Sequence, residues 1–101
     1  MSRRRIRFTA TARGQVTREK LWWLENRIHA EIFAAELEEA LRILAFLPGA
    51  GTSYSRAGVT GLRRIYLRKV AYHIYYTFDD QDVIVRAFWS AQRGRGPFAT
   101  P

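Results

Sequence analysis

The chain has 101 residues, 48% of them apolar and none of them cysteine. This size fits a single small domain over residues 1–101 with a thin core, and the missing thiols exclude disulfides and cysteine-based zinc sites. No apolar run approaches the roughly 20 residues of a membrane-spanning helix. The net charge of +8 favours a polyanionic partner.

Charge is spread unevenly along the chain: the predicted helical part is mildly acidic, and the predicted strands after it are strongly basic. Between Glu19 and Arg42 there are six acidic and three basic residues, whereas from Arg56 onward there are eight basic and three acidic ones. This asymmetry predicts a directional basic binding face rather than general solubility. No apolar segment follows the arginines near the N-terminus, so we expect no secretion signal and predict a cytoplasmic protein.

The first 26 residues predict a strand followed by a helix. Residues 3–9 alternate in character, as expected for a strand with one buried side. Thr9 or Thr11 can cap the following helix, residues 12–26, because a threonine oxygen accepts a hydrogen bond from a free amide of the first turn. Both features predict that the chain passes from a strand into a helix near Thr9.

A second helical pattern covers residues 30–47, and a break near Arg27 makes the two helices a hairpin. One helix through both patterns would be about 50 Å long, too long for short strands to cover. Trp22 and Trp23 are adjacent and cannot both face the core, so one of them is expected to be partly exposed. The apolar stripe of the second helix consists of Phe33, Leu37, Ala40, Leu41 and Leu44.

Pro48 and Gly49 end the second helix. The segment 49–61 is rich in glycine and small polar residues and is predicted to be a loop. Residues 94–101 are predicted to form a flexible basic tail. With the strands described next, the order is β-α-α-β-β-β, an α+β fold in which a helical hairpin packs on a small, mostly antiparallel sheet.

Three strands are predicted between Leu62 and Arg93, with a tight connection at Val70-Ala71 and a hairpin loop at Asp79–Asp82. Strict alternation assigns their side chains to two faces. The predicted core face carries Ile65, Leu67, Tyr72, Ile74, Tyr76, Phe78, Val83, Val85, Ala87 and Trp89. The predicted outer face carries Arg64, Tyr66, Arg68, His73, Tyr75, Ile84, Arg86 and Phe88.

The outer face is basic and aromatic, which suits an anionic or flat partner. A neutral His73 among arginines can serve as a general base, or it can be an ordinary half-buried strand residue. The arginines can hold a phosphate backbone and stabilise developing charge, or they can bind an acidic peptide. The tyrosines can stack on bases or pack across strands. The composition indicates no metal site and no cofactor, since the histidines lack cysteine or carboxylate neighbours.

The order of elements and several motifs resemble the RelE/ParE superfamily, the toxins of bacterial type II toxin–antitoxin systems. The resemblance runs from Ile6 to Pro97 and implies the fold above, growth inhibition and plasmid stabilisation as functions, and a cognate antitoxin as partner. The matching motifs are I-R-F-T, L-R-R-I-Y-L-R, Y-H-I-Y-Y-T-F-D-D, V-I-V-R-A-F-W and S-A-Q-R-G-R-G-P.

RelE-like members enter the ribosome and cut messenger RNA. The resemblance implies that Arg64, His73 and Arg93 would be catalytic in such an endoribonuclease. The implied binding residues are Tyr66, Arg68, Tyr75 and Arg86. The chain departs from this pattern, because Tyr66 stands where a second lysine is common and His73 where an arginine is common. The tyrosine usual near the C-terminus is missing after Arg93.

ParE-like members inhibit DNA gyrase as protein ligands and need only a binding surface. These departures therefore favour a ParE-like toxin that binds gyrase and is neutralised by an acidic, amphipathic antitoxin folding onto the basic face. A ribosome-dependent messenger RNA endoribonuclease is the alternative, so enzymatic activity stays open. A non-enzymatic nucleic-acid-binding module is a third possibility, which explains the charge but not the order of the motifs.

Overall fold

The computed structural model describes residues 3–55, 58–93 and 96–98. Its elements in chain order are β1 (Arg5–Phe8), α1 (Ala10–Asn26), α2 (Glu31–Phe46), the 3-10 helix η1 (Pro48–Ala50), β2 (Thr52–Ser53), β3 (Arg63–Leu67), β4 (Tyr72–Phe78) and β5 (Asp82–Ser90). The predicted order of elements is confirmed, with two additions: η1, which begins at Pro48 just before the predicted loop, and the short strand β2 inside that loop. Neither α1 nor α2 is long and apolar enough to cross a membrane.

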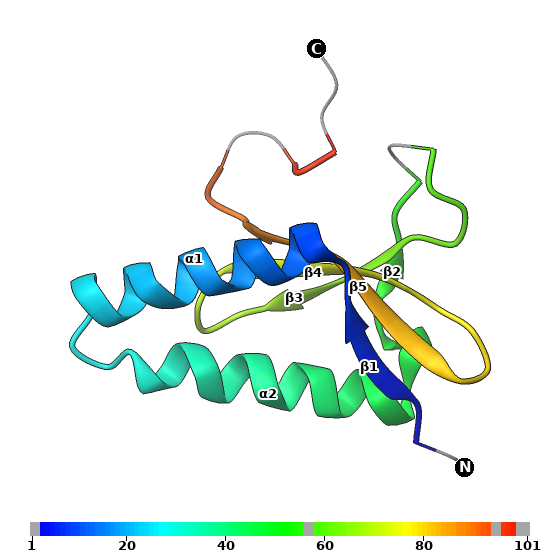
Figure 1. Ribbon diagram of the computed structural model, residues 1–101, viewed down its shortest axis with the longest axis horizontal. Helices are drawn as coiled ribbons and strands as arrows, with labels where there is room; N and C mark the ends of the chain where they lie inside the picture. Colours follow the sequence, from blue (N-terminus) through cyan, green and yellow to red (C-terminus); the bar gives the residue numbers. More distant parts are fainter. Residues whose placement is uncertain (1–2, 56–57, 94–95, 99–101) are drawn as a thin grey trace.

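The five strands form one sheet in the order β1-β5-β4-β3-β2. β1 runs parallel to β5, and the other neighbouring strands are antiparallel, as predicted. Figure 1 shows α1 and α2 as an antiparallel pair beside the strands. Both helices contribute to the main core against one face of the sheet, which leaves the opposite, outer face for other contacts.

The helical hairpin follows local signals in the sequence. The Thr9 hydroxyl accepts a hydrogen bond from the Ala12 amide at 3.1 Å, so α1 begins two residues earlier than predicted. The two helices are separated by residues 27–30, which confirms the predicted break near Arg27. The predicted stripe of α2 faces the main core, where Phe33 and Leu44 are fully buried.

A β-bulge interrupts the pairing of β4 and β5. Tyr75 pairs with Ala87, but the next residue, Tyr76, pairs with Val85. Arg86 is therefore an extra residue on β5 with no partner position on β4. Beyond the bulge, the side chains of β5 change faces relative to strict alternation.

This change of faces makes part of the predicted assignment wrong. Phe88 belongs to the main core, where its ring stacks on Tyr72 at 4.7 Å between centroids. Ala87 and Trp89, which were predicted for the core face, belong to a second cluster on the outer face. Phe78 was also predicted for the core, but it lies at the end of β4 with 39% of its surface exposed.

The segment after α2 is anchored to the sheet by one tyrosine. The buried Tyr76 hydroxyl donates to the Pro48 carbonyl at 2.6 Å and accepts from the Gly51 amide at 2.9 Å. A Cβ at Gly51 would lie 2.6 Å from this hydroxyl and from the Arg64 carbonyl, so only glycine allows the contact. Burial raises the pKa of Tyr76, which therefore stays a donor.

We expect Tyr76→Phe to lower the free energy of unfolding by about 1–3 kcal/mol, because a buried carbonyl and a buried amide lose their partner. The matched control is Tyr66→Phe at an exposed tyrosine, which should stay within about 0.5 kcal/mol of the wild type. Urea unfolding of the three proteins measures both values. Equal stabilities for the two variants would contradict the anchoring role of Tyr76.

Substitutions at Phe88 and Phe78 test the placement of side chains that follows from the bulge. Phe88→Ala should cost about 3–5 kcal/mol because it empties a packed core position, and Phe78→Ala should cost clearly less because that ring is already partly in solvent. Strict alternation along β4 and β5 puts Phe78 in the core and Phe88 on the outer face, and therefore predicts the opposite order. Thermal or urea unfolding ranks the two variants, and a loss for Phe88→Ala no larger than that for Phe78→Ala would contradict the core position that the bulge gives Phe88.

Candidate functional site

The outer face of the sheet brings together most of the residues that the sequence indicated. The register places Tyr66 beside His73 and His73 beside Trp89, so these three form one row across β3, β4 and β5. In the next row Arg64 lies beside Tyr75. Two of the predicted catalytic residues, Arg64 and His73, therefore lie on adjacent strands and on the same face.

His73 occupies the middle of this row and is half-buried. Its ring lies 5.0 Å from the Tyr66 ring and 5.9 Å from the Tyr75 ring. Burial lowers the pKa of His73, and the positive charge of Arg64 lowers it further. The imidazole is therefore neutral near pH 7 and able to accept a proton.

Arg64 is held by aromatic side chains rather than left open to solvent. Its guanidinium lies 4.7 Å from the centre of the Tyr54 ring, and its Nη1 donates to the Tyr75 hydroxyl at 3.4 Å. These contacts fix the guanidinium over the middle of the face. They also occupy part of the donor capacity that a phosphate group would need.

The middle of the outer face is closed by side chains that pack around Tyr75. Only 2% of the Tyr75 surface is exposed, and the residue forms a second small core with Leu62 and Ala87. Burial raises the pKa of the Tyr75 hydroxyl. The side chains packed against this second core are Tyr54, Val59, Trp89 and Phe98. Tyr75 cannot stack on a base while this cover is in place.

Phe98 comes from the predicted flexible tail. Its ring lies 5.4 Å from the Tyr75 ring in an edge-to-face contact. Most of that tail, residues 94–95 and 99–101, lies outside the described residues. The described part, residues 96–98, contributes to the cover of the outer face.

Arg93 lies just after β5, and its guanidinium is engaged on two sides. It lies 4.3 Å from the centre of the Trp89 ring, and its Nη2 is 3.5 Å from Oε2 of Glu19 on α1. Trp89 is in the same row as His73, so Arg93 is connected to this row through the Trp89 ring. The carboxylate of Glu19 neutralises part of its charge.

The other two predicted binding arginines lie apart from this row. Arg86 is the extra residue of the bulge, and its Nε donates to the Thr77 hydroxyl at 2.8 Å. Arg68 follows β3 and is exposed on the turn that leads to β4. Within the described ranges, no group of three or more potential ligand residues could hold a metal ion. The face can thus supply positive charge and one neutral imidazole.

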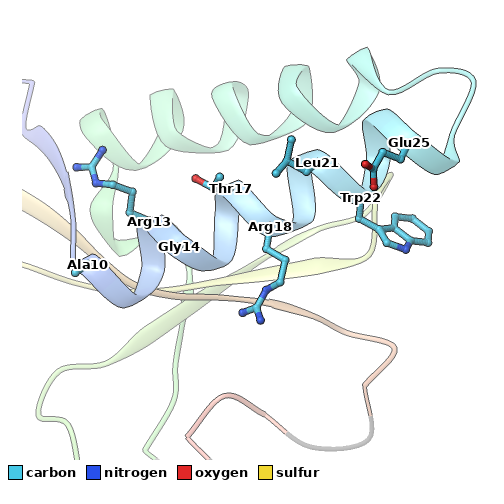
Figure 2. Close-up of a pocket in the computed structure, with 8 residues that line it drawn as sticks. All are labelled: Ala10, Arg13, Gly14, Thr17, Arg18, Leu21, Trp22 and Glu25. Atoms are coloured by element: carbon cyan, nitrogen blue, oxygen red, sulfur yellow. The ribbon is translucent and has the colours of Figure 1, made fainter.

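A second exposed surface lies on the outward side of α1. The sequence predicted only one of its features, an exposed tryptophan. Trp22 is exposed, whereas Trp23 is half-buried and donates its Nε1–H to the Tyr72 hydroxyl at 3.2 Å, so one tryptophan of the pair is indeed exposed. A shallow groove follows the outward side of α1. Figure 2 shows Leu21 pointing to one side of this helix and Trp22 to the other. Ile28 at the hairpin tip is 94% exposed. The sequence signal for this surface was weak, because the apolar residues of α1 do not form one stripe.

We expect an NMR titration to give His73 a pKa below its ordinary value of 6.5. Arg64→Gln should raise this pKa but leave it below 6.5, because burial is the larger cause. Arg68→Gln, a charge removal at the exposed turn, is the control and should have little effect. The unfolded chain binds a proton at His73 more readily than the folded chain, so this residue should destabilise the fold as the pH falls below 6.5. A pKa above 6.5 would contradict this environment.

Comparison with known proteins identifies the family. Residues 6–94 match the family model described as the ParE toxin of the type II toxin–antitoxin system parDE. A search of curated protein sequences returned no match. The fold is similar to that of a chain from the chromosomal ParDE toxin–antitoxin system of P. aeruginosa, with a TM-score of 0.70, 11% identity, and coverage of 88% of this chain and 97% of that chain.

A chain from the toxin–antitoxin complex RelBE2 of Mycobacterium tuberculosis is also similar, with a TM-score of 0.64 and 25% identity, covering 91% of this chain and 97% of that chain. These structures confirm the α+β fold that the sequence predicted. The family model spans most of the sequence, from the first strand to the segment after β5. The chain therefore belongs to the ParE toxin family of type II toxin–antitoxin systems.

Proposed function

We propose that this ParE-family toxin arrests growth by binding DNA gyrase as a protein ligand, without chemistry of its own, and that a cognate antitoxin neutralises it. The observation that carries the proposal is the closed middle of the outer face, where Tyr75 is buried under its cover. A surface with a rigid, aromatic and basic exterior is suited to recognition of another macromolecule.

The engagement of the two arginines also favours binding over cleavage. A ribonuclease must bring a scissile phosphate next to a base and to cations that stabilise developing charge. Here Arg64 contacts Tyr54 and Tyr75, and Arg93 contacts Glu19 and Trp89. Binding RNA in a reactive geometry would require these contacts to be broken.

Exposed apolar side chains on the helical hairpin support an antitoxin partner. Trp22, Leu24 and Ile28 are all exposed on or just after α1, and such surfaces commonly mark interaction sites. The net charge of +8 favours an acidic partner. The two similar structures come from toxin–antitoxin systems. An acidic, amphipathic segment of the antitoxin would cover both the apolar and the basic surfaces.

One observation favours the alternative, a ribosome-dependent endoribonuclease. His73 has a lowered pKa and lies next to Arg64, which is the arrangement of a general base beside a cation. In this alternative, His73 would abstract a proton while Arg64 and Arg93 stabilise the charge that develops on the phosphate. The two proposals make opposite predictions for the loss of the imidazole.

We expect the purified toxin to inhibit supercoiling by purified gyrase at micromolar concentration, and an equimolar amount of the antitoxin to restore it. His73→Gln should keep inhibition within about threefold, because binding needs no proton acceptor. Tyr66→Ala should weaken inhibition about tenfold, because exposed tyrosines often contribute more than 1 kcal/mol to interfaces. Gel assays of plasmid topology measure the inhibition of supercoiling by the wild type and by the two variants.

The same proteins should be tested in a translation extract for messenger RNA cleavage. We expect no cleavage by the wild type. Unaffected supercoiling at micromolar toxin, together with codon-linked cleavage that disappears in His73→Gln, would overturn the gyrase proposal and establish the nuclease alternative. Thermal unfolding of each variant controls for loss of the fold.

A further inference from the structure

A polar cleft lies at one end of the sheet, apart from the closed middle of the outer face. Its volume is about 430 Å³, within the range of small-molecule sites. Three segments line it: the C-terminal half of α1, the turn between β3 and β4, and the segment after β5. We call it the end cleft.

Three cations line the end cleft, one from each segment. They are Arg27 after α1, Lys69 in the turn, and Arg93 after β5. The only carboxylate among the lining residues is Glu19, so the lining carries a net charge of about +2 near pH 7. Cations that converge from separate segments are typical of a site for a multiply charged anion rather than of a solvated surface.

The turn that carries Lys69 is fixed by a carboxylate of α2. Glu36 accepts hydrogen bonds from the Lys69 amide at 3.1 Å and from the Val70 amide at 3.0 Å. Ala71, the next residue, has a φ of 63°, a conformation that non-glycine residues rarely adopt. Because both amides are occupied, the turn offers a ligand the ammonium group of Lys69 rather than backbone donors.

Glu19 has a second partner besides Arg93. Its Oε1 accepts a hydrogen bond from the Tyr72 hydroxyl at 2.6 Å, and burial together with this bond raises the pKa of Tyr72 to about 12. The contact between Glu19 and Arg93 is longer, at 3.5 Å. An anion bound in the end cleft would have to break only the longer Glu19–Arg93 contact, and Glu19 would keep its bond to Tyr72.

The end cleft also has an aromatic wall. Trp22 is 44% exposed and lines the cleft together with Trp23. The guanidinium of Arg27 lies 5.2 Å and 5.3 Å from the ring centres of these two tryptophans. An exposed indole next to a cluster of cations presents a flat surface beside an anion site.

We infer that the end cleft binds a nucleoside monophosphate, with the phosphate among Arg27, Lys69 and Arg93 and the base against Trp22. The charge of a phosphate monoester dianion matches the net charge of the lining, and the cleft is larger than a phosphate ion needs. This inference is independent of gyrase binding, because it uses no residue of the closed middle of the outer face.

Isothermal titration calorimetry of the full chain with adenosine 5′-monophosphate, inorganic phosphate and adenosine, at fixed ionic strength, tests the site. We expect saturable binding of the monophosphate, binding of phosphate at least about tenfold weaker, and no binding of adenosine. Undetectable binding of the monophosphate at millimolar concentration would overturn the inference. Equal affinities for the monophosphate and phosphate would overturn the assignment of a nucleotide.

Charge variants locate the bound phosphate. Lys69→Gln and Arg27→Gln should each weaken binding of the monophosphate about tenfold or more, because each removes a charge-assisted contact. Lys69→Arg should restore most of the affinity. Arg68→Gln is the matched control, since Arg68 lies on the same turn but is not among the residues lining the end cleft. An equal loss in Arg68→Gln would indicate general charge attraction and overturn the site.

The wild-type protein provides a readout that does not depend on how the variants fold. In a 15N NMR titration with the monophosphate, the indole N–H signal of Trp22 should move in a saturable way, with the dissociation constant found by calorimetry. A Trp22 signal that stays in place while the monophosphate binds would place the ligand elsewhere and overturn the inference.

Discussion

The extra residue that Arg86 inserts into β5 determines which side chains the two faces of the sheet carry. It allows Phe88 to stack on Tyr72 in the main core and moves Trp89 to the outer face. The bulge is tied to its surroundings, because the Arg86 carbonyl accepts a hydrogen bond from the Thr9 hydroxyl at 3.4 Å and its Nε donates to Thr77. Since Thr9 also caps α1, the start of the helical hairpin and the bulge are coupled.

Because of the bulge, the outer face has a small core of its own, and side chains from other segments cover this core. Ala87 presents only a methyl group beside Tyr75, so Tyr54 and Phe98 can pack over them from segments that are distant in the sequence. What remains accessible is the row that begins with the exposed Tyr66. This arrangement provides a firm basic and aromatic surface, which suits a toxin that acts by binding. A nuclease would need the arginines to be released from their present contacts.

The sequence predicted the fold well where local rules decide the structure. The cap at Thr9, the apolar stripe of α2 and the stop at Pro48 are each encoded in a few neighbouring residues. The sequence did not predict the bulge, because no local sequence signal at Arg86 indicates one. A strict period of two also assumes an uninterrupted ladder of paired residues. The sequence did not reveal the cover of Tyr75, because the covering residues Tyr54, Val59 and Phe98 lie in segments predicted to be a loop and a tail. Their packing depends on long-range contacts that periodicity cannot reveal.

The solvent accessibility of the tyrosines on the sheet tests most directly whether the middle of the outer face is closed. Hydroxyl-radical footprinting with mass spectrometry measures the modification rate of each residue in the free toxin. We expect rapid modification of Tyr66, which is 49% exposed, and protection of Tyr75 similar to that of the fully buried Tyr76. Modification of Tyr75 as fast as that of Tyr66 would show that the outer face is open and would contradict the closed arrangement around Tyr75.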